Sequence, residues 1–184
     1  LQEFFAYARA QPGGVNLASA GGIIDLTTDL LAKGGKIDIV KIPYKGTAAS
    51  LTAVIAGEVQ FSFANVPAIL GHVKNGRLRA LAVTDHVRSK YLPDVPSTKE
   101  LGYPTVISSS TRGITGPKGM DPKIVAKLAD TFKKAMEDAD HVKKLEDVGL
   151  AIKIMTGAEY QKYFDDLHAT SARLVEWAQK RPQK

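Results

Sequence analysis

The feature that most constrains the fold is a regular alternation of two residue patterns between residues 15 and 83. Runs rich in β-branched and apolar residues alternate there with segments whose apolar residues recur at helical spacing. The predicted strands are residues 15–18, 37–42, 59–64 and 78–83, and the predicted helices are residues 23–33, 48–56 and 67–74. Because short connections join strictly alternating elements, this segment is typical of βαβ units, and we expect a parallel sheet with helices on its faces.

Glycine and proline set the expected ends of these elements. Gly34 and Gly35 are expected to close the helix that begins at residue 23, because glycine readily adopts the left-handed conformation that ends helices. Pro67 is the first residue of the helix predicted at 67–74, a position at which its missing N–H costs little.

The pattern changes after residue 84. Residues 85–105 are rich in turns and contain Pro93, Pro96 and Pro104, and residues 106–114 are expected to be extended. Three helices are predicted beyond them, at about 122–138, 140–148 and 157–179. These helices have no strands of their own, so they need another surface to pack against.

Composition excludes several kinds of chemistry. The 184 residues include no cysteine, which removes disulfides, thiolate metal sites and a cysteine nucleophile. The four histidines have no metal-like spacing, and no G-x-S-x-G pattern surrounds Ser108, Ser109 and Ser110. We therefore expect no enzyme activity, no metal and no cofactor.

The net charge of +6 is spread along the chain. Small clusters such as Lys133-Lys134 and Lys143-Lys144 fall on predicted helices, and no long basic run occurs. A nucleic-acid surface is usually more concentrated, so a solvated surface is the preferred interpretation. No apolar run approaches the roughly 18 residues that a membrane span needs. The chain opens within an amphipathic helical pattern at residues 2–10, which indicates a mature or trimmed product.

Five motifs, in this order, resemble the substrate-binding proteins of tripartite tricarboxylate transporters, the Bug or TctC family. They are residues 15–21 (VNLASAG), 42–46 (IPYKG), 56–61 (AGEVQF), 76–84 (GRLRALAVT) and 92–102 (LPDVPSTKELG). The resemblance runs from Leu1 to about Trp177. After Gly21 the family usually has a further Gly-Ser and often a histidine, where this chain has Gly22, Ile23, Ile24 and Asp25.

The resemblance implies an α/β fold of the type II periplasmic binding proteins, in which two lobes close on a small carboxylate. On this basis residues 1–112 are the second lobe, and residues 113–184 are C-terminal helices that belong to the first lobe. The N-terminal part of the first lobe, with its glycine-rich loop, is expected to be absent. The implied location is the periplasm of a Gram-negative bacterium, and the implied partners are a small organic carboxylate and the membrane permease subunits of the transporter.

The candidate binding residues follow the carboxyl ends of the predicted strands, where ligands of such sheets bind. They are Ser19, Ala20, Gly21 and Gly22, then Tyr44, Gly46 and Thr47, then Asn65, and finally Thr111 and Arg112 in the extended segment. N–H groups at a helix start attract a carboxylate, and an arginine binds one through two hydrogen bonds.

Each candidate also has a structural explanation that stays open. The turn at Ser19 is compatible with an ordinary strand-to-helix connection, and Tyr44 with packing on the lobe surface beside a solvated Lys45. Asn65 suits a helix N-cap, and Arg112 a surface position.

One alternative function belongs to another class. If half of the cleft is absent, the chain would act as an interaction or scaffold module whose orphaned surface is covered by a second copy. An α/β enzyme is the least supported of the three functional hypotheses, since the sequence contains no nucleophile–base pair, phosphate-binding loop or metal motif.

Overall fold

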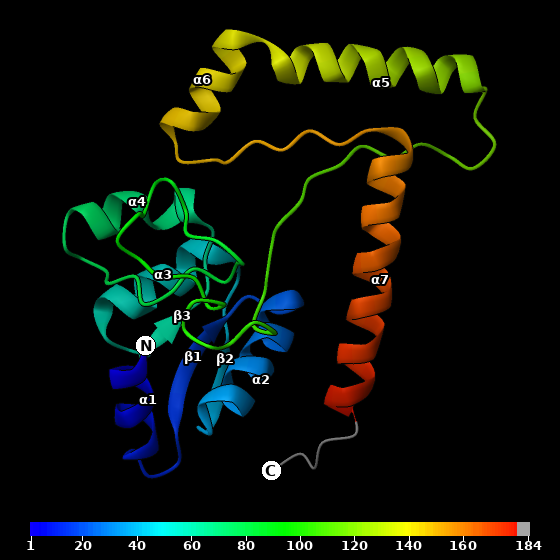
Figure 1. Cartoon of the computed structure of the whole chain (residues 1–184). Helices are drawn as coiled ribbons and strands as arrows, with labels where there is room; N and C mark the ends of the chain where they lie inside the picture. Colours follow the sequence, from blue (N-terminus) through cyan, green and yellow to red (C-terminus); the bar gives the residue numbers. More distant parts are fainter. Residues whose placement is uncertain (180–184) are drawn as a thin grey trace. The chain divides into compact units, whose positions relative to one another are not determined.

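The computed structural model describes residues 1–179 and divides the chain into two compact units (Figure 1). The first unit is Leu1–Ser110, and the second begins at Thr111. All the buried hydrophobic side chains of the described residues belong to the first unit, from Phe5 to Val106. No described helix has the length and apolar character needed to cross a membrane.

The first unit is built on a parallel sheet of three strands. Strand β1 (Val15–Ser19) lies in the centre, between β2 (Ile39–Pro43) and β3 (Phe61–Ser62). Both neighbours of β1 run parallel to it. The predicted parallel α/β fold is confirmed.

Helices cover both faces of this sheet. They are α1 (Gln2–Arg9), α2 (Ile23–Gly35), α3 (Thr47–Ala56) and α4 (Val66–Lys74). Val15 packs with residues of α1 and α2, whereas Ala18 packs with Ala53 of α3. Side chains three apart along a strand point to opposite faces, so the two clusters lie on opposite sides of the sheet.

Helix α2 does not end at its two glycines, so that expectation is wrong. The helix continues through Gly35, and the residue that takes the left-handed conformation is Lys36, with φ at 51°. The glycines provide room instead. A β-carbon on Gly34 would stand 2.8 Å from the ring of Tyr103, and one on Gly35 would stand 2.6 Å from the ring of Phe5.

The predicted strand at residues 78–83 is also wrong. Only Val83 forms a bridge there, an isolated one to Ser97. The neighbouring strand β3 is two residues long, so a further strand has almost no ladder to join. Leu78 instead donates its N–H to the carbonyl oxygen of His72.

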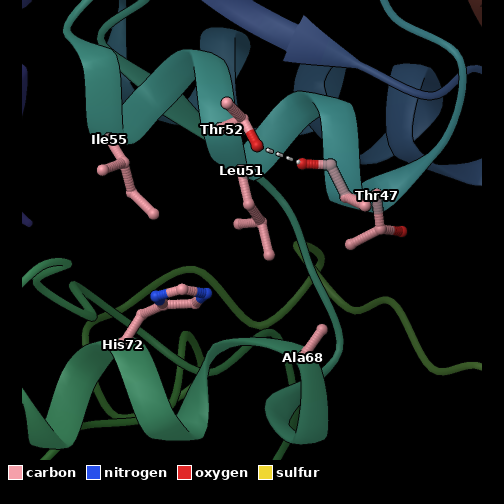
Figure 2. A pocket seen from close by; sticks show the side chains of 7 residues that line it. Thr47, Leu51, Thr52, Ile55, Ala68 and His72 are labelled. Atoms are coloured by element: carbon pink, nitrogen blue, oxygen red, sulfur yellow. Dashed lines mark hydrogen bonds between the residues drawn. The ribbon is translucent and has the colours of Figure 1, made fainter.

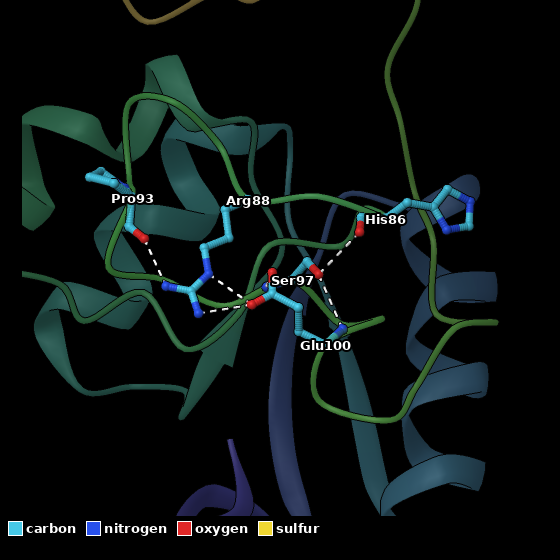
Figure 3. A network of polar contacts seen from close by, with 5 residues as sticks. All are labelled: His86, Arg88, Pro93, Ser97 and Glu100. Carbon is cyan, nitrogen blue, oxygen red and sulfur yellow. Dashed lines mark hydrogen bonds and ion pairs between the residues drawn. The ribbon is translucent and has the colours of Figure 1, made fainter.

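A polar network organises the loop that follows (Figure 3). Nε and one terminal nitrogen of Arg88 lie 2.8 Å from the same carboxylate oxygen of Glu100, and the other terminal nitrogen donates to the carbonyl oxygen of Pro93 at 3.0 Å. The backbone N–H of Glu100 donates to Oγ of Ser97 at 3.2 Å. The hydrogen bond from Arg88 lowers the pKa of Glu100 below its usual range.

The second unit carries the helices α5 (Pro122–Glu137), α6 (Ala139–Asp147) and α7 (Gly157–Gln179), within a residue of their predicted bounds. The Asp121 carboxylate caps α5 by accepting the N–H of Lys123 at 2.8 Å. The predicted extended segment at 106–114 forms no strand, and its first residue, Val106, is buried in the first unit.

Candidate functional site

An open cavity of about 320 Å³ lies at the carboxyl ends of β1 and β2. This is the edge at which open parallel sheets bind ligands, and the volume suits a small molecule. Its wall is formed by Ser19, Ala20, Gly21, Asp25, Lys41, Pro43 and Tyr44.

Strand register brings these residues together. Ser19 is the last residue of β1 and pairs with Pro43, the last residue of β2. The N–H of Tyr44 then donates to the carbonyl oxygen of Ser19 at 2.8 Å, which fixes the exit of β2 beside the exit of β1. Lys41 and Pro43 are two apart in β2, so their side chains share a face of the sheet.

The turn after β1 is held by its own hydrogen bonds. Ser19 is 4% exposed, and its Oγ donates to Oδ1 of Asp25 at 2.5 Å. The same Oγ accepts the N–H of Gly21 at 2.9 Å. Asp25 stands in the first turn of α2, where a carboxylate interacts favourably with the helix dipole. The Ser19 hydroxyl therefore positions the turn, and the Asp25 carboxylate is the acidic group of the cavity wall.

Two further ionisable groups line the cavity. Nζ of Lys41 lies 3.0 Å from Oδ1 of Asp29, and the two side chains are 30% and 20% exposed. The Tyr44 hydroxyl donates to Glu58 at 3.4 Å. Desolvation raises the pKa of Tyr44 above its usual value, and the neighbouring Glu58 carboxylate raises it further. Tyr44 therefore faces the cavity as a neutral phenol at ordinary pH.

The structure brings together four of the predicted site residues, namely Ser19, Ala20, Gly21 and Tyr44. Gly22 and Gly46 are the N-cap residues of α2 and α3, and both have positive φ angles, 63° and 87°, that favour glycine. Asn65 is the N-cap residue of α4 and makes no side-chain capping hydrogen bond. Their part in binding stays a prediction.

Thr111 and Arg112 belong to the second unit, where both are exposed and lie outside helix and strand. Their part in binding also stays a prediction. The sequence analysis missed Asp25, Lys41 and Pro43 as cavity residues. The signal that was available is the two-residue spacing of Lys41 and Pro43 at the end of a predicted strand.

A second hollow, of about 420 Å³, lies between α3 and α4 (Figure 2). Its wall includes Ala48, Leu51, Ile55 and Ala68 as well as Thr47, Thr52 and His72. The Thr52 hydroxyl donates to the carbonyl oxygen of Ala48 at 3.0 Å, so it is already engaged. With no acidic, lysine or arginine side chain in its wall, this hollow is less suited to an organic acid than the cavity beside β1.

Within the described part of the chain, no group of three or more His, Cys, Asp or Glu side chains is placed to hold a metal ion.

Comparison with known families decides the identity. Residues 1–179 match TctC, the tripartite tricarboxylate transporter family receptor. The chain belongs to this family. The predicted resemblance to the Bug or TctC proteins is thereby confirmed.

Individual relatives agree with this TctC assignment. A protein from the gbd 5′ region of Cupriavidus necator is 38% identical over 165 residues, which are 89% of this chain and 50% of the relative. BugT of Bordetella pertussis is 33% identical over 168 residues, which are 90% of this chain and 52% of BugT. This TctC chain thus spans about half the length of these curated relatives.

Solved structures resemble this TctC chain in fold, as predicted for a periplasmic binding protein. One, a periplasmic transporter, is 25% identical with a TM-score of 0.82 over 98% of this chain and 60% of its own. A Rhodopseudomonas palustris protein with adipate is 26% identical and has a TM-score of 0.76. The match covers 97% of this chain and 58% of that protein. MatC of that organism, with bound malate, is 27% identical and has a TM-score of 0.69. The match covers 81% of this chain and 51% of MatC.

Proposed function

We propose that this chain is the ligand-binding part of a periplasmic receptor that captures a small organic acid. The receptor delivers the acid to the membrane permease subunits of a tripartite tricarboxylate-type transporter, and it carries out no reaction. The observation that carries the proposal is the cavity at the ends of β1 and β2, which combines a small-molecule volume with a few polar side chains.

Three features support the binding of an acid. Lys41 supplies a cation to the cavity wall. The neutral phenol of Tyr44 donates its one hydrogen to Glu58 at 3.4 Å and would turn that hydrogen to a bound acid. One solved structure that resembles this chain in fold is of a protein with adipate, and another is of a protein with bound malate. Tyr44 and Lys41 would hold the carboxylate of such a ligand by charge and hydrogen bonding.

A thermal-shift screen of the 184-residue chain tests this proposal. The panel contains succinate, malate, adipate, citrate, aspartate and benzoate. A ligand at 100 times its Kd stabilises the fold by about 2.7 kcal/mol, so binding gives a clear rise in Tm. The Lys41→Gln variant should lose the shift, and Lys74→Gln, which removes an exposed lysine from α4, should keep it. No shift with any acid, from a protein that melts cooperatively, contradicts the proposal.

One observation favours a second candidate, an interaction module that pairs with another copy of itself. The side chains of Ile124, Leu128, Phe132 and Met136 recur every four residues along α5 and are 53%, 42%, 42% and 36% exposed. Such an apolar stripe is typical of a surface that packs against a partner.

Sedimentation of the chain across a hundred-fold range of concentration tests this candidate. Self-association through α5 predicts a mass that rises with concentration in the wild type and stays monomeric in Phe132→Asp. The control Lys127→Asp also introduces an aspartate on α5, outside the apolar stripe, and should leave association intact. A constant monomeric mass for the wild type rules the candidate out.

A further inference from the structure

The charge on the cavity wall is unevenly distributed. Among the described residues that line the cavity, Asp25 is the only acid and Lys41 is the only base. Lys41 is already neutralised in part, because its Nζ lies 3.0 Å from a carboxylate oxygen of Asp29. The negative charge of Asp25 is therefore not neutralised by its partner, the hydroxyl of Ser19. The positive charge of Lys41, in contrast, is paired with the carboxylate of Asp29.

The end of the cavity beside α2 is unsuited to a second carboxylate. Asp25 occupies the first turn of the helix, so the favourable helix-dipole position already holds an anion. The N–H of Gly21, which would be available to an incoming anion, donates to Oγ of Ser19 instead. A ligand carboxylate placed there would meet a like charge in a partly desolvated site, which is unfavourable.

An ammonium group fits the same position. It carries the opposite charge to Asp25, and its N–H donors match the acceptor oxygens of a carboxylate. The carboxylate of the same ligand would then lie on the β2 side of the cavity. To hold it there, Lys41 would share its charge between Asp29 and the ligand, and Tyr44 would turn its hydroxyl from Glu58 to the ligand. An amino acid offers both groups on one small molecule.

We propose that Asp25 is the selectivity residue of this cavity and favours an amino acid over the dicarboxylate of the same carbon skeleton. This inference rests on the proposed function, because it assigns a ligand class to the same cavity. Asp25 acts by direct charge pairing with the ligand's ammonium group, while its bond to Ser19 holds the carboxylate in position.

Isothermal titration of the whole chain with aspartate and with succinate tests the proposal, since these ligands differ by one ammonium group. The wild type should bind aspartate at least ten-fold more tightly than succinate. Asp25→Asn should abolish that preference, because asparagine keeps an oxygen that accepts from Ser19 and loses only the charge. The control Asp94→Asn removes an exposed aspartate outside the cavity wall and should leave the ten-fold ratio unchanged.

A wild-type measurement keeps the test independent of the folding of the variant. N-acetylaspartate has the carboxylates of aspartate but no ammonium group, so it should bind the wild type at least ten-fold more weakly than aspartate. Equal affinities for aspartate and succinate in the wild type, or an unchanged ratio in Asp25→Asn, would overturn the proposal while leaving acid binding intact. Absence of binding by aspartate, succinate and N-acetylaspartate alike would overturn the role of Asp25. Absence of binding by every acid of the thermal-shift panel would overturn the proposed function as well.

Discussion

Gly35 and the ring of Phe5 are packed so closely that a β-carbon on the glycine would stand 2.6 Å from Cε1 of Phe5. Phe5 is fully buried at 0% exposure, so its ring has no solvent-facing position to move into. Gly35→Ala should therefore lower the free energy of unfolding by about 1–3 kcal/mol, the usual cost of overpacking. Urea unfolding of the variant beside the wild type measures this.

A second glycine offers the matched control. Gly71 lies within α4, and a β-carbon there would meet nothing within 4 Å. Gly71→Ala should raise the free energy of unfolding by about 0.5–1 kcal/mol, because alanine loses less backbone entropy in a helix. Equal effects of the two substitutions would contradict the packing account of Gly35.

Removing the Ser19 hydroxyl should destabilise the turn after β1. Ser19→Ala leaves Asp25 without its donor and the N–H of Gly21 without its acceptor in a mostly buried setting. The expected loss is about 1–2 kcal/mol of unfolding free energy, by chemical denaturation. Ser110→Ala, at an exposed position, should change it little, and a Ser19→Ala variant as stable as the wild type would show that the network is not stabilising.

The Arg88–Glu100 contact should make stability depend on pH. Its hydrogen bonds lower the pKa of Glu100, so the contribution is present above the ordinary glutamate pKa of about 4.3 and is lost as pH falls through the lowered value. The Tm difference between wild type and Arg88→Gln should therefore be largest above about pH 5 and shrink in acid to the part that the contact with Pro93 supplies.

Glu100→Gln provides the control for that titration. It removes the titrating group. The Tm difference between the wild type and Glu100→Gln should therefore also fade in acid, where Glu100 is protonated. A difference between wild type and Arg88→Gln that stays constant from neutral pH into acid would show that Arg88 stabilises the loop only through Pro93.

Hydrogen exchange should differ sharply between the two units. The amides of β1 lie between two paired strands within the buried core, whereas the side chains of α5 are largely exposed. Local opening is easier where few apolar contacts are buried, so the α5 amides should exchange much faster than those of β1. Equal protection at high protein concentration would instead indicate that another surface covers α5.

Local sequence patterns were sufficient for most of the fold because helix and strand periodicity reflects which face is buried. They failed where the deciding contact comes from a distant segment. Gly34 and Gly35 resemble a helix end, and only the rings of Tyr103 and Phe5 explain why they lie inside α2. Residues 78–83 have the composition of a strand, but the shortness of β3 leaves them almost no partner.

The sequence predicted where in the fold the candidate cavity lies, but it did not predict all the side chains that line it. The rule that ligands bind at the carboxyl ends of parallel strands led to Ser19 and Tyr44, both of which line the cavity. Asp25 and Lys41 were missed because their direction depends on the hydrogen bond to Ser19 and on the register of β2 against β1. Neither relationship is visible in a short window of sequence.

The most direct test of the central claim is an NMR titration of the ¹⁵N-labelled chain with the acid that gives the largest thermal shift. Binding in the cavity predicts saturable amide shifts at Ser19, Ala20, Gly21 and Tyr44, with little change at Leu51, Ile55 and His72 of the other hollow. Shifts confined to the α3–α4 hollow, or none at all at millimolar ligand, would contradict the claim that the cavity at the ends of β1 and β2 is the binding site.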